Sequence, residues 1–260
     1  MERRVGYRRE SDRFYFCAET KPRDGCSSVP VHYSLRLPFR MKISLPHRSD
    51  SIPVSKLLCI GRNYADHAAE MNREVPDQPM VFLKPPSALI RTGEAVELPP
   101  QSQEVHHEVE LVAVIGKEGK NIPREEALDH VAAFGLGLDM TARDLQTQAK
   151  ERRHPWSVAK GFDTFAPLGS LTPASAVDDP QDITLRLAVN GEVRQEANTR
   201  RLFFPVAELV HYCSQIFTLS PGDLLYTGTP SGVGPVEDGD ELEASASGLE
   251  TLRVSVRRLD

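Results

Sequence analysis

The sequence predicts an α+β fold that is mainly β, on three observations. Short runs of Val, Ile, Leu and Phe recur between Gly and Pro residues, which is typical of buried strands. The pair Asn190-Gly191, a favoured two-residue hairpin turn, separates two such runs. Apolar residues at helical spacing occur in only a few segments. Because 260 residues with 40% apolar content can bury one sizeable core, we expect one large domain rather than two.

The first 40 residues differ in charge from the rest of the chain. They hold nine Lys/Arg and five Asp/Glu, a balance of +4 within a total of −6, so the remaining 220 residues carry −10. They also lack a periodic apolar face, so we expect residues 1–50 to be a disordered or poorly ordered extension before a domain at 51–260. Met41 is then a plausible alternative start. An Arg-rich transit peptide is the other interpretation, but five acidic residues argue against it.

Composition excludes several classes of protein. No run of 18 apolar residues occurs, and no apolar segment follows the N-terminal charges, which argues against a membrane span or a secretory signal. An acidic body without a basic stripe argues against nucleic acid as a partner. The four cysteines lack metal-ligand spacing and are expected to be reduced thiols: Cys17, Cys26, Cys59 and Cys213. We therefore expect a soluble, cytoplasmic protein.

The first elements of the domain are a strand and a short helix. A buried strand is expected at residues 55–60, and the turn at Gly61 leads to a helix from about 65 to 71. His67 and Glu70 lie at i and i+3 on that helix, where a carboxylate can orient an imidazole and raise its basicity. An ordinary surface pair is the alternative.

The next strand, at residues 80–84, is stopped by two prolines. Its last residue, Lys84, either caps the edge of a sheet or contacts a substrate. The sequence leaves these two interpretations open.

An acidic pair lies in the strand expected at residues 106–116. Successive side chains of a strand point to opposite faces, so Glu108 and Glu110 point the same way. Their face continues with Val112 and Val114, which suggests a sheet covered on both sides, where two carboxylates need a cation. A hard cation with oxygen ligands can span Cα atoms about 7 Å apart. A half-exposed strand is the alternative.

Two more polar residues follow in apolar surroundings. Residues 123–134 are expected to form a packing helix, and residues 134–139 a strand that ends at Asp139. Asp139 is either a functional carboxylate or a cap of the helix after it. Lys160 lies in a largely apolar segment, where a lysine either reaches out to water or is held by carboxylates.

The C-terminal third is predicted to contain structural elements without a catalytic role, followed by a glycine-rich loop. A hairpin is expected at residues 183–196, and an amphipathic helix at 205–217 on which His211 is structural. A strand at 224–226 precedes the loop at 227–234, and two strands close the chain. The loop lacks the Gly-Lys-Ser/Thr ending of a phosphate loop, but its backbone N–H groups could hold a carboxylate.

Taken together, six motifs in order resemble the fumarylacetoacetate hydrolase family, most closely its small single-domain acylpyruvases and oxaloacetate decarboxylases. The resemblance runs from about residue 57 to the C-terminus. The motifs are residues 61–67, 82–85, 106–111, 138–144, 156–160 and 227–234.

The resemblance implies a mixed β-sandwich roll with peripheral helices, a homodimer, and a bound Mg²⁺ or Mn²⁺ ion. The metal ligands it implies are Glu108, Glu110 and Asp139. The catalytic residues it implies are the active-site lysine, Lys160, and a water-activating dyad, His67 and Glu70. The substrate contacts it implies are Arg62, Tyr64, Gln146 and Thr229.

The activity implied by the resemblance is hydrolysis of the C–C bond of 3-acylpyruvates, such as acetylpyruvate or fumarylpyruvate, with oxaloacetate decarboxylation as a second activity. Both reactions produce the pyruvate enolate, which a metal stabilises, but only hydrolysis needs an attacking water. One alternative is an isomerase, hydratase or decarboxylase of 2-hydroxymuconate-type diacids in aromatic catabolism; the presence of His67 and Glu70 weighs against the isomerase. A non-catalytic metal-binding protein is the other alternative.

Overall fold

The structure, a computed structural model, divides into two compact units, Met1–Arg40 and Met41–Asp260. It describes residues 6–10, 13–17, 41–46, 49–64 and 77–258. The described part of the first unit is one antiparallel hairpin, β1 (Gly6–Glu10) and β2 (Arg13–Cys17), which the sequence did not lead us to expect.

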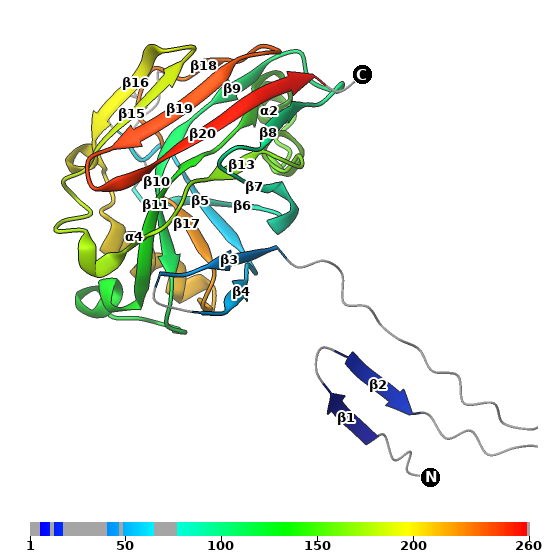
Figure 1. The fold of residues 1–260 in the computed structure, drawn as a ribbon, viewed down its shortest axis with the longest axis vertical. Coiled ribbons are helices and arrows are strands. Elements are labelled where there is room, and N and C mark those ends of the chain that lie inside the picture. Colours follow the sequence, from blue (N-terminus) through cyan, green and yellow to red (C-terminus); the bar gives the residue numbers. More distant parts are fainter. Residues whose placement is uncertain (1–5, 11–12, 18–40, 47–48, 65–76, 259–260) are drawn as a thin grey trace, which may run out of the picture. The chain divides into compact units, whose positions relative to one another are not determined.

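The second unit is built around two large sheets (Figure 1). The larger has the order β6-β5-β17-β10-β11-β13-β7, with β14 paired to β11. Its strands are β5 (Leu57–Gly61), β6 (Met80–Lys84), β7 (Leu89–Arg91), β10 (Val109–Ile115), β11 (Val131–Leu138), β13 (Ala166–Leu168), β14 (Thr172–Pro173) and β17 (Leu224–Tyr226). The smaller has the order β16-β15-β19-β20-β8. Its strands are β8 (Ala95–Leu98), β15 (Thr184–Val189), β16 (Glu192–Asn198), β19 (Glu241–Ala246) and β20 (Leu249–Arg258).

Short sheets and helices lie around these two. The sheet β12-β9-β18 contains β9 (Val105–His107), β12 (Thr141–Ala142) and β18 (Gly234–Pro235), and a separate hairpin contains β3 (Lys42–Ser44) and β4 (Ser51–Pro53). The described α-helices are α2 (Arg143–Glu151), α3 (Ser157–Lys160) and α4 (Val206–Ile216). The 3₁₀ helices are η1 (Pro86–Ala88), η2 (Arg124–His130), η3 (Ala174–Ala176) and η4 (Thr199–Arg201).

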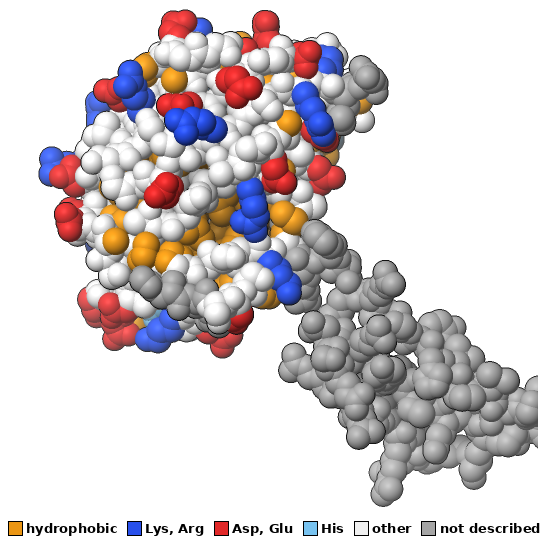
Figure 2. Space-filling view, in the orientation of Figure 1, with side chains coloured by type: hydrophobic (Ala, Val, Ile, Leu, Met, Phe, Trp, Pro, Cys, Tyr) orange, Lys and Arg blue, Asp and Glu red, His pale blue; other side chains and the backbone are white. Residues whose placement is uncertain are grey.

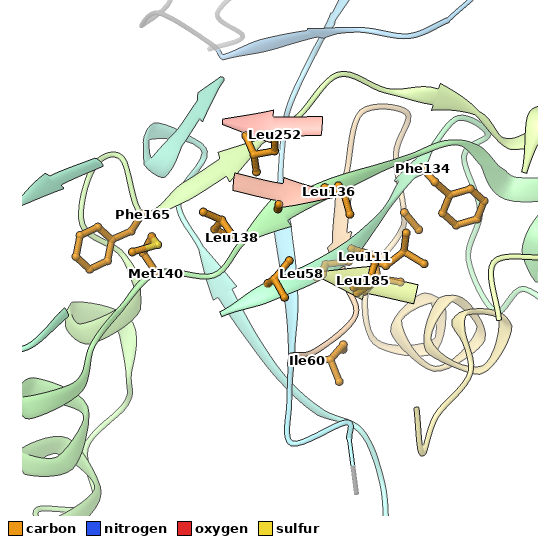
Figure 3. Close-up of a cluster of buried hydrophobic side chains, with 14 of the residues drawn as sticks. Leu58, Ile60, Leu111, Phe134, Leu136, Leu138, Met140, Phe165, Leu185 and Leu252 are labelled. Carbon is orange, nitrogen blue, oxygen red and sulfur yellow. The ribbon is translucent and has the colours of Figure 1, made fainter. Parts of the chain in front are cut away.

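The main hydrophobic core lies between the two sheets (Figure 3). Leu58, Leu111 and Leu136 enter it from the larger sheet. Leu185 and Leu252 enter it from the smaller one. The sandwich-like, mainly β architecture implied by the family resemblance is therefore confirmed.

Strand β10 is buried on both faces, as we expected from the apolar residues that follow Glu108 and Glu110 on their face. All seven of its residues are buried, and Leu111 belongs to the core between the sheets. Val112 and Val114 belong to a second hydrophobic cluster on the opposite face. Ile43 and Ile52, from β3 and β4, cover that cluster. Side chains on the same face of β10 as Glu110 are consequently shielded from water.

The compact unit begins at Met41 rather than at residue 51. The difference arises because two side chains before residue 51 are buried in the unit. Ile43 of β3 is fully buried, and Leu45, which directly follows β3, is 5% exposed. A strand of only three residues offered too little periodicity for the sequence alone to reveal this cover.

This boundary predicts two different outcomes for truncation. Deleting residues 1–40 should leave the melting temperature and the activity nearly unchanged. Deleting residues 1–50 should cost roughly 3–6 kcal/mol of unfolding free energy, because two buried aliphatic side chains are lost at about 1.5–3 kcal/mol each. Urea unfolding of the two truncated proteins beside the full chain measures the difference. Equal stability of both truncations would contradict the role of β3 as a cover.

One predicted helix is wrong in type and length, and two other elements are confirmed. Residues 124–130 form the 3₁₀ helix η2, and residues from 131 onward belong to β11, because pairing with β10 overrides the local helical spacing. The hairpin is present, with positive φ at Asn190 (51°) and Gly191 (81°). Helix α4 buries its expected face. The helix expected at 65–71 lies outside the described residues.

On the face shown in Figure 2, acidic and basic side chains of the second unit are interspersed rather than gathered by sign. Among the described residues, no helix is long and apolar enough to cross a membrane.

Candidate metal centre and active site

Three carboxylates meet where β10 and β11 pair. Glu108 immediately precedes β10, Glu110 is its second residue, and Asp139 follows the end of β11. The antiparallel pairing of Val109 with Leu138 places Asp139 beside Glu108, and the Asp139 N–H donates to the Glu108 carbonyl at 2.8 Å. One carboxylate oxygen from each of the three residues lies within 4.8 Å of the others.

All three residues of this triad (Glu108, Glu110 and Asp139) are buried, with exposures of 5%, 1% and 1%. The prediction that Glu108 and Glu110 point the same way is confirmed. Asp139 does not cap α2, whose N-cap is Ala142, so the cap interpretation is wrong.

Two buried lysines pair with the triad. Lys160, at the end of α3, donates to Glu108 Oε2 at 2.8 Å and to Asp139 Oδ2 at 2.6 Å. Lys84 lies 2.6 Å from Asp139 Oδ1 and donates to the carbonyls of Met140 (2.8 Å) and Phe165 (2.5 Å). Each lysine is only 2% exposed. Lys160 is therefore held by carboxylates, and Lys84 supports Asp139 rather than capping an exposed edge.

Arg143 adds a third cation, from the first turn of α2. Its Nη2 donates to Glu108 Oε1 at 2.5 Å, and its Nη1 donates to Gln146 Oε1 at 2.7 Å. We assigned no role to Arg143 from the sequence, although its position three residues before Gln146 on a helix places the two on one face. The triad thus faces three cationic side chains.

Burial makes the ionisation of the site unusual. Burial raises the pKa of Glu110 well above its ordinary value, and the charge of Asp139 adds to this effect. The Gly228 N–H, which donates to Glu110 Oε2 at 2.8 Å, opposes that rise in pKa. Burial alone would lower the pKa of Lys160, but Asp139 and Glu108 outweigh it and the pKa is raised. Burial lowers the pKa of Lys84 despite its pairing with Asp139.

This donor set fits a hard divalent cation. Carboxylate oxygens are the ligands that Mg²⁺ and Mn²⁺ prefer, and three of them leave part of a six-coordinate shell open. Because its pKa is raised, the Glu110 carboxyl group binds a proton more tightly than a free carboxyl group does, and a divalent cation competes with that proton. The triad is consequently a candidate divalent metal centre.

A pocket opens beside the triad, and it contains three of the four expected substrate contacts. Its lining residues are Ile60, Gly61, Arg62, Met80, Phe82, Glu108, Glu110, Asp139, Arg143, Gln146, Lys150, Trp156, Lys160 and Thr229. The aromatic wall is one T-shaped pair, Phe82 and Trp156, with ring centroids 5.9 Å apart. The pocket therefore joins a charged floor to an apolar side.

Tyr64, the fourth expected substrate contact, does not line this pocket. Tyr64 forms an isolated β-bridge with Leu202, and its side chain packs in a small hydrophobic cluster with Leu202 and Ala197. There it is 1% exposed. His67 and Glu70 lie outside the described residues.

Two buried amides near the site were missed by the sequence argument. Asn63 donates to the carbonyls of Thr227 (2.8 Å) and Phe204 (3.0 Å) and thereby anchors the start of the glycine-rich loop. Gln195 comes from the hairpin that we interpreted as scaffold only, and it is 1% exposed. A signal was present in the sequence, because Gln195 is two residues from both Val193 and Ala197 and therefore shares the inward face of a strand with them.

Cys59 and Cys213 are both free and buried. This agrees with the expectation of reduced thiols at these two positions. Burial raises the pKa of the Cys213 thiol to about 12, so the thiol stays protonated at neutral pH.

Comparisons with known proteins place this geometry among enzymes. The chain is 45% identical over 204 residues to "Oxaloacetate tautomerase FAHD1, mitochondrial" of Arabidopsis thaliana, covering 78% of this chain and 92% of that protein. It is 45% identical over 197 residues to "Oxaloacetate decarboxylase, mitochondrial" of Dictyostelium discoideum, covering 75% and 90%.

A solved structure is similar over most of the chain. It is fumarylpyruvate hydrolase from Pseudomonas aeruginosa in complex with Mn²⁺ and pyruvate, with 42% identity and a TM-score of 0.80, covering 85% of this chain and 97% of that one. The family profile described as "Fumarylacetoacetate (FAA) hydrolase C-terminal" matches residues 56–257. The chain therefore belongs to the fumarylacetoacetate hydrolase family.

Proposed function

We propose that this protein is a Mg²⁺- or Mn²⁺-dependent hydrolase that cleaves the C–C bond of 3-acylpyruvates, releasing pyruvate and a carboxylic acid. The observation that carries the proposal is the buried triad surrounded by three cationic side chains at the floor of a pocket. The Mn²⁺ and pyruvate in the Pseudomonas aeruginosa relative support both the kind of metal and the 2-oxo acid.

Within this proposal the triad holds the metal. When bound, the cation supplies Lewis-acid stabilisation to the oxygen on which the enolate charge develops. Lys160 keeps Glu108 and Asp139 oriented, and its raised pKa keeps it an ammonium at neutral pH.

A charge count supports an enolate product. The three carboxylates contribute −3, and Lys84, Lys160 and Arg143 contribute +3. A divalent cation brings the site to +2. Pyruvate enolate carries −2, one charge on its carboxylate and one on its enolate oxygen, so the loaded site and this species are complementary.

The residues that line the pocket are proposed to bind the substrate. Arg62, Gln146 and Thr229 line the pocket and are proposed to contact the substrate. His67, assisted by Glu70, is proposed as the general base that activates water for attack on the C4 carbonyl. Water adds to that carbonyl as the base takes one of its protons, and the C3–C4 bond breaks with its electron pair going to C3 as the enolate of pyruvate. Protonation of C3 by the proton taken from water then gives pyruvate beside the released carboxylic acid.

A second candidate function is decarboxylation or tautomerisation of oxaloacetate. It is favoured by the names of two relatives that are 45% identical to this chain. Loss of CO₂ from oxaloacetate leaves the same pyruvate enolate without an attacking water, and tautomerisation moves a proton through an enolate of oxaloacetate. The isomerase alternative keeps some support, because a 5-carboxymethyl-2-hydroxymuconate delta-isomerase of Mycobacterium smegmatis is 35% identical.

We further propose a homodimer, as the family resemblance implies. A cytoplasmic location also stays a prediction, and it gains no support from the relatives in Arabidopsis thaliana and Dictyostelium discoideum, whose names place them in mitochondria.

A substrate panel tests the proposal. Acetylpyruvate, fumarylpyruvate and oxaloacetate are each supplied with Mg²⁺, with Mn²⁺ and with EDTA, and release of pyruvate is followed. We expect turnover of an acylpyruvate with either metal and loss of turnover in EDTA. Turnover of oxaloacetate alone would favour the second function, and undiminished turnover in EDTA would contradict the metal-dependent mechanism.

A further inference from the structure

Gln195 connects the two sheets at the metal centre. It extends from β16 of the smaller sheet to the strand of the larger sheet that carries the acidic pair. Its Oε1 accepts a hydrogen bond from the Val109 N–H at 3.0 Å. Its Nε2 donates to Thr229 Oγ1 at 2.9 Å and to the Pro230 carbonyl at 3.0 Å. The Gln195 amide and these three partners are all buried, between β10 and the glycine-rich loop.

The orientation of the Gln195 amide is fixed by its partners. A backbone N–H only donates and a backbone carbonyl only accepts, so the oxygen of the amide must face Val109 and its nitrogen must face Pro230. The same oxygen lies 3.0 Å from His107 Nδ1, which must therefore carry the ring proton as donor. A side chain without both a donor and an acceptor cannot replace this one.

The partners of Gln195 surround Glu110 in the chain and in space. Val109 lies between Glu108 and Glu110. Thr229 Oγ1 donates to the Val109 carbonyl at 2.8 Å, and the preceding Gly228 N–H donates to Glu110 Oε2 at 2.8 Å. The amide of Gln195 thus holds two segments, the backbone that bears the acidic pair and the loop that orients one of its carboxylates.

The loop is fixed on its other side as well. Gly228 has φ of +104°, and a Cβ there would meet the Cβ of Asn63 at 2.7 Å. Asn63 in turn donates to the Thr227 carbonyl. With Asn63 on one side and Gln195 on the other, little freedom remains for the position of the Gly228 N–H.

We propose that Gln195 is a positioning residue of the metal centre, which sets the affinity of the triad for its divalent cation by holding the Glu110 carboxylate in place. This inference rests on the proposed function, because it assumes that the triad binds a cation. Outer partners that orient metal ligands typically change metal affinity 10- to 100-fold when they are removed.

The test uses the full chain and measures Mn²⁺ binding without substrate. Gln195→Met keeps the length of the side chain and removes both halves of the amide. Thr229→Val keeps the shape of the threonine and removes the hydroxyl that Gln195 binds. Free Mn²⁺ is followed by electron paramagnetic resonance during titration, and melting temperatures are measured with and without Mn²⁺.

Gln181 provides a matched control. It is also a glutamine that joins two backbone segments, since its Nε2 donates to the Thr199 carbonyl at 2.5 Å and its Oε1 accepts from the Val206 N–H at 3.2 Å. None of these groups lines the candidate site. Gln181→Met therefore reports what the loss of such an amide does to stability alone.

We expect Gln195→Met to weaken Mn²⁺ binding roughly 10- to 100-fold and Thr229→Val to weaken it less. Gln181→Met should lower the melting temperature and leave the Mn²⁺ affinity at the wild-type value. Wild-type affinity in folded Gln195→Met would overturn the inference, and if that variant does not fold, wild-type affinity in Thr229→Val would overturn it. Absence of Mn²⁺ binding by the wild-type chain would instead overturn the proposed function, so the two failures are distinguishable.

Discussion

Glu110→Gln and Asp139→Asn should both abolish the thermal stabilisation that Mn²⁺ gives to the protein, yet they should shift the stability of the metal-free protein in opposite directions. The first variant should be at least as stable as the wild type without metal, and the second should be less stable. Both should lose metal-dependent turnover, because each removes one of the three carboxylates proposed to hold the metal. The stabilisation is lost because a ligand that binds only the folded state raises its stability by mass action.

Asp139 is expected to be costly to replace because two buried ammonium groups depend on it. Lys160 and Lys84 each approach one of its carboxylate oxygens at 2.6 Å. Removing one partner of a buried ion pair leaves the other charge uncompensated, which costs roughly 3–5 kcal/mol. An asparagine keeps the size of the side chain and one acceptor but none of the charge.

Glu110 is expected to be replaceable because its buried negative charge destabilises the folded metal-free protein. Its folded-state pKa is raised, so the folded protein binds a proton more tightly than the unfolded chain does. The cost of Glu110 is absent below its ordinary pKa and grows as the pH rises toward the folded-state value. The stability advantage of Glu110→Gln over the wild type should therefore increase with pH in that window.

Thermal unfolding of both variants and the wild type, with Mn²⁺ and with EDTA over a range of pH, measures these effects. Gln181→Met again controls for the loss of a partly buried polar contact away from the triad. Retained Mn²⁺-dependent stabilisation in either variant would contradict the ligand assignment. A metal-free Glu110→Gln protein that is clearly less stable than the wild type would contradict the argument from its pKa.

The acidic pair shows what the sequence could predict about this site. Strand periodicity alone placed Glu108 and Glu110 on one face, and the apolar continuation of that face correctly predicted that both sides of the sheet are covered. These inferences succeed because they concern neighbours along one strand. Asp139 and Lys160 joined the acidic pair only through the family resemblance, since no local pattern brings β11 and α3 to the end of β10.

Lys84, Arg143 and Gln195 mark the limit of such reasoning. Each acts on the site from an element distant in the chain, and the sheet order that unites them depends on pairings such as β5 with β17 that have no local signature. The same limitation explains the wrong helix at residues 131–134, where the apolar spacing suits a helix but the partner strand decides the outcome. A polar residue at an inward-facing strand position, such as Gln195, is the sequence pattern that could have indicated such a distant contribution to the site.

His67→Ala should separate hydrolysis from decarboxylation. If His67 is the general base that activates water, its loss should lower kcat for acetylpyruvate by roughly 10²- to 10⁴-fold, the usual range for general acid–base catalysis. Decarboxylation of oxaloacetate needs stabilisation of the enolate but no attacking water, so its rate should fall much less. Mn²⁺ affinity should stay at the wild-type value, because the proposed ligand set is the buried triad and does not include His67.

Glu70→Gln should act in the same direction but more weakly. Glutamine keeps a hydrogen-bond partner for the imidazole and removes the negative charge that stabilises the imidazolium once it has taken the proton from water.

The measurement is a comparison of kcat for acetylpyruvate and for oxaloacetate in the wild type, His67→Ala and Glu70→Gln, with Mn²⁺ affinity determined for each. A proportional loss of both activities in His67→Ala at unchanged Mn²⁺ affinity would contradict the general-base role. That result would mean that His67 positions the 2-oxo acid portion that the two substrates share. A selective loss of hydrolysis would instead assign water activation to His67, because the two reactions share the metal and the enolate and differ only in their need for the attacking water.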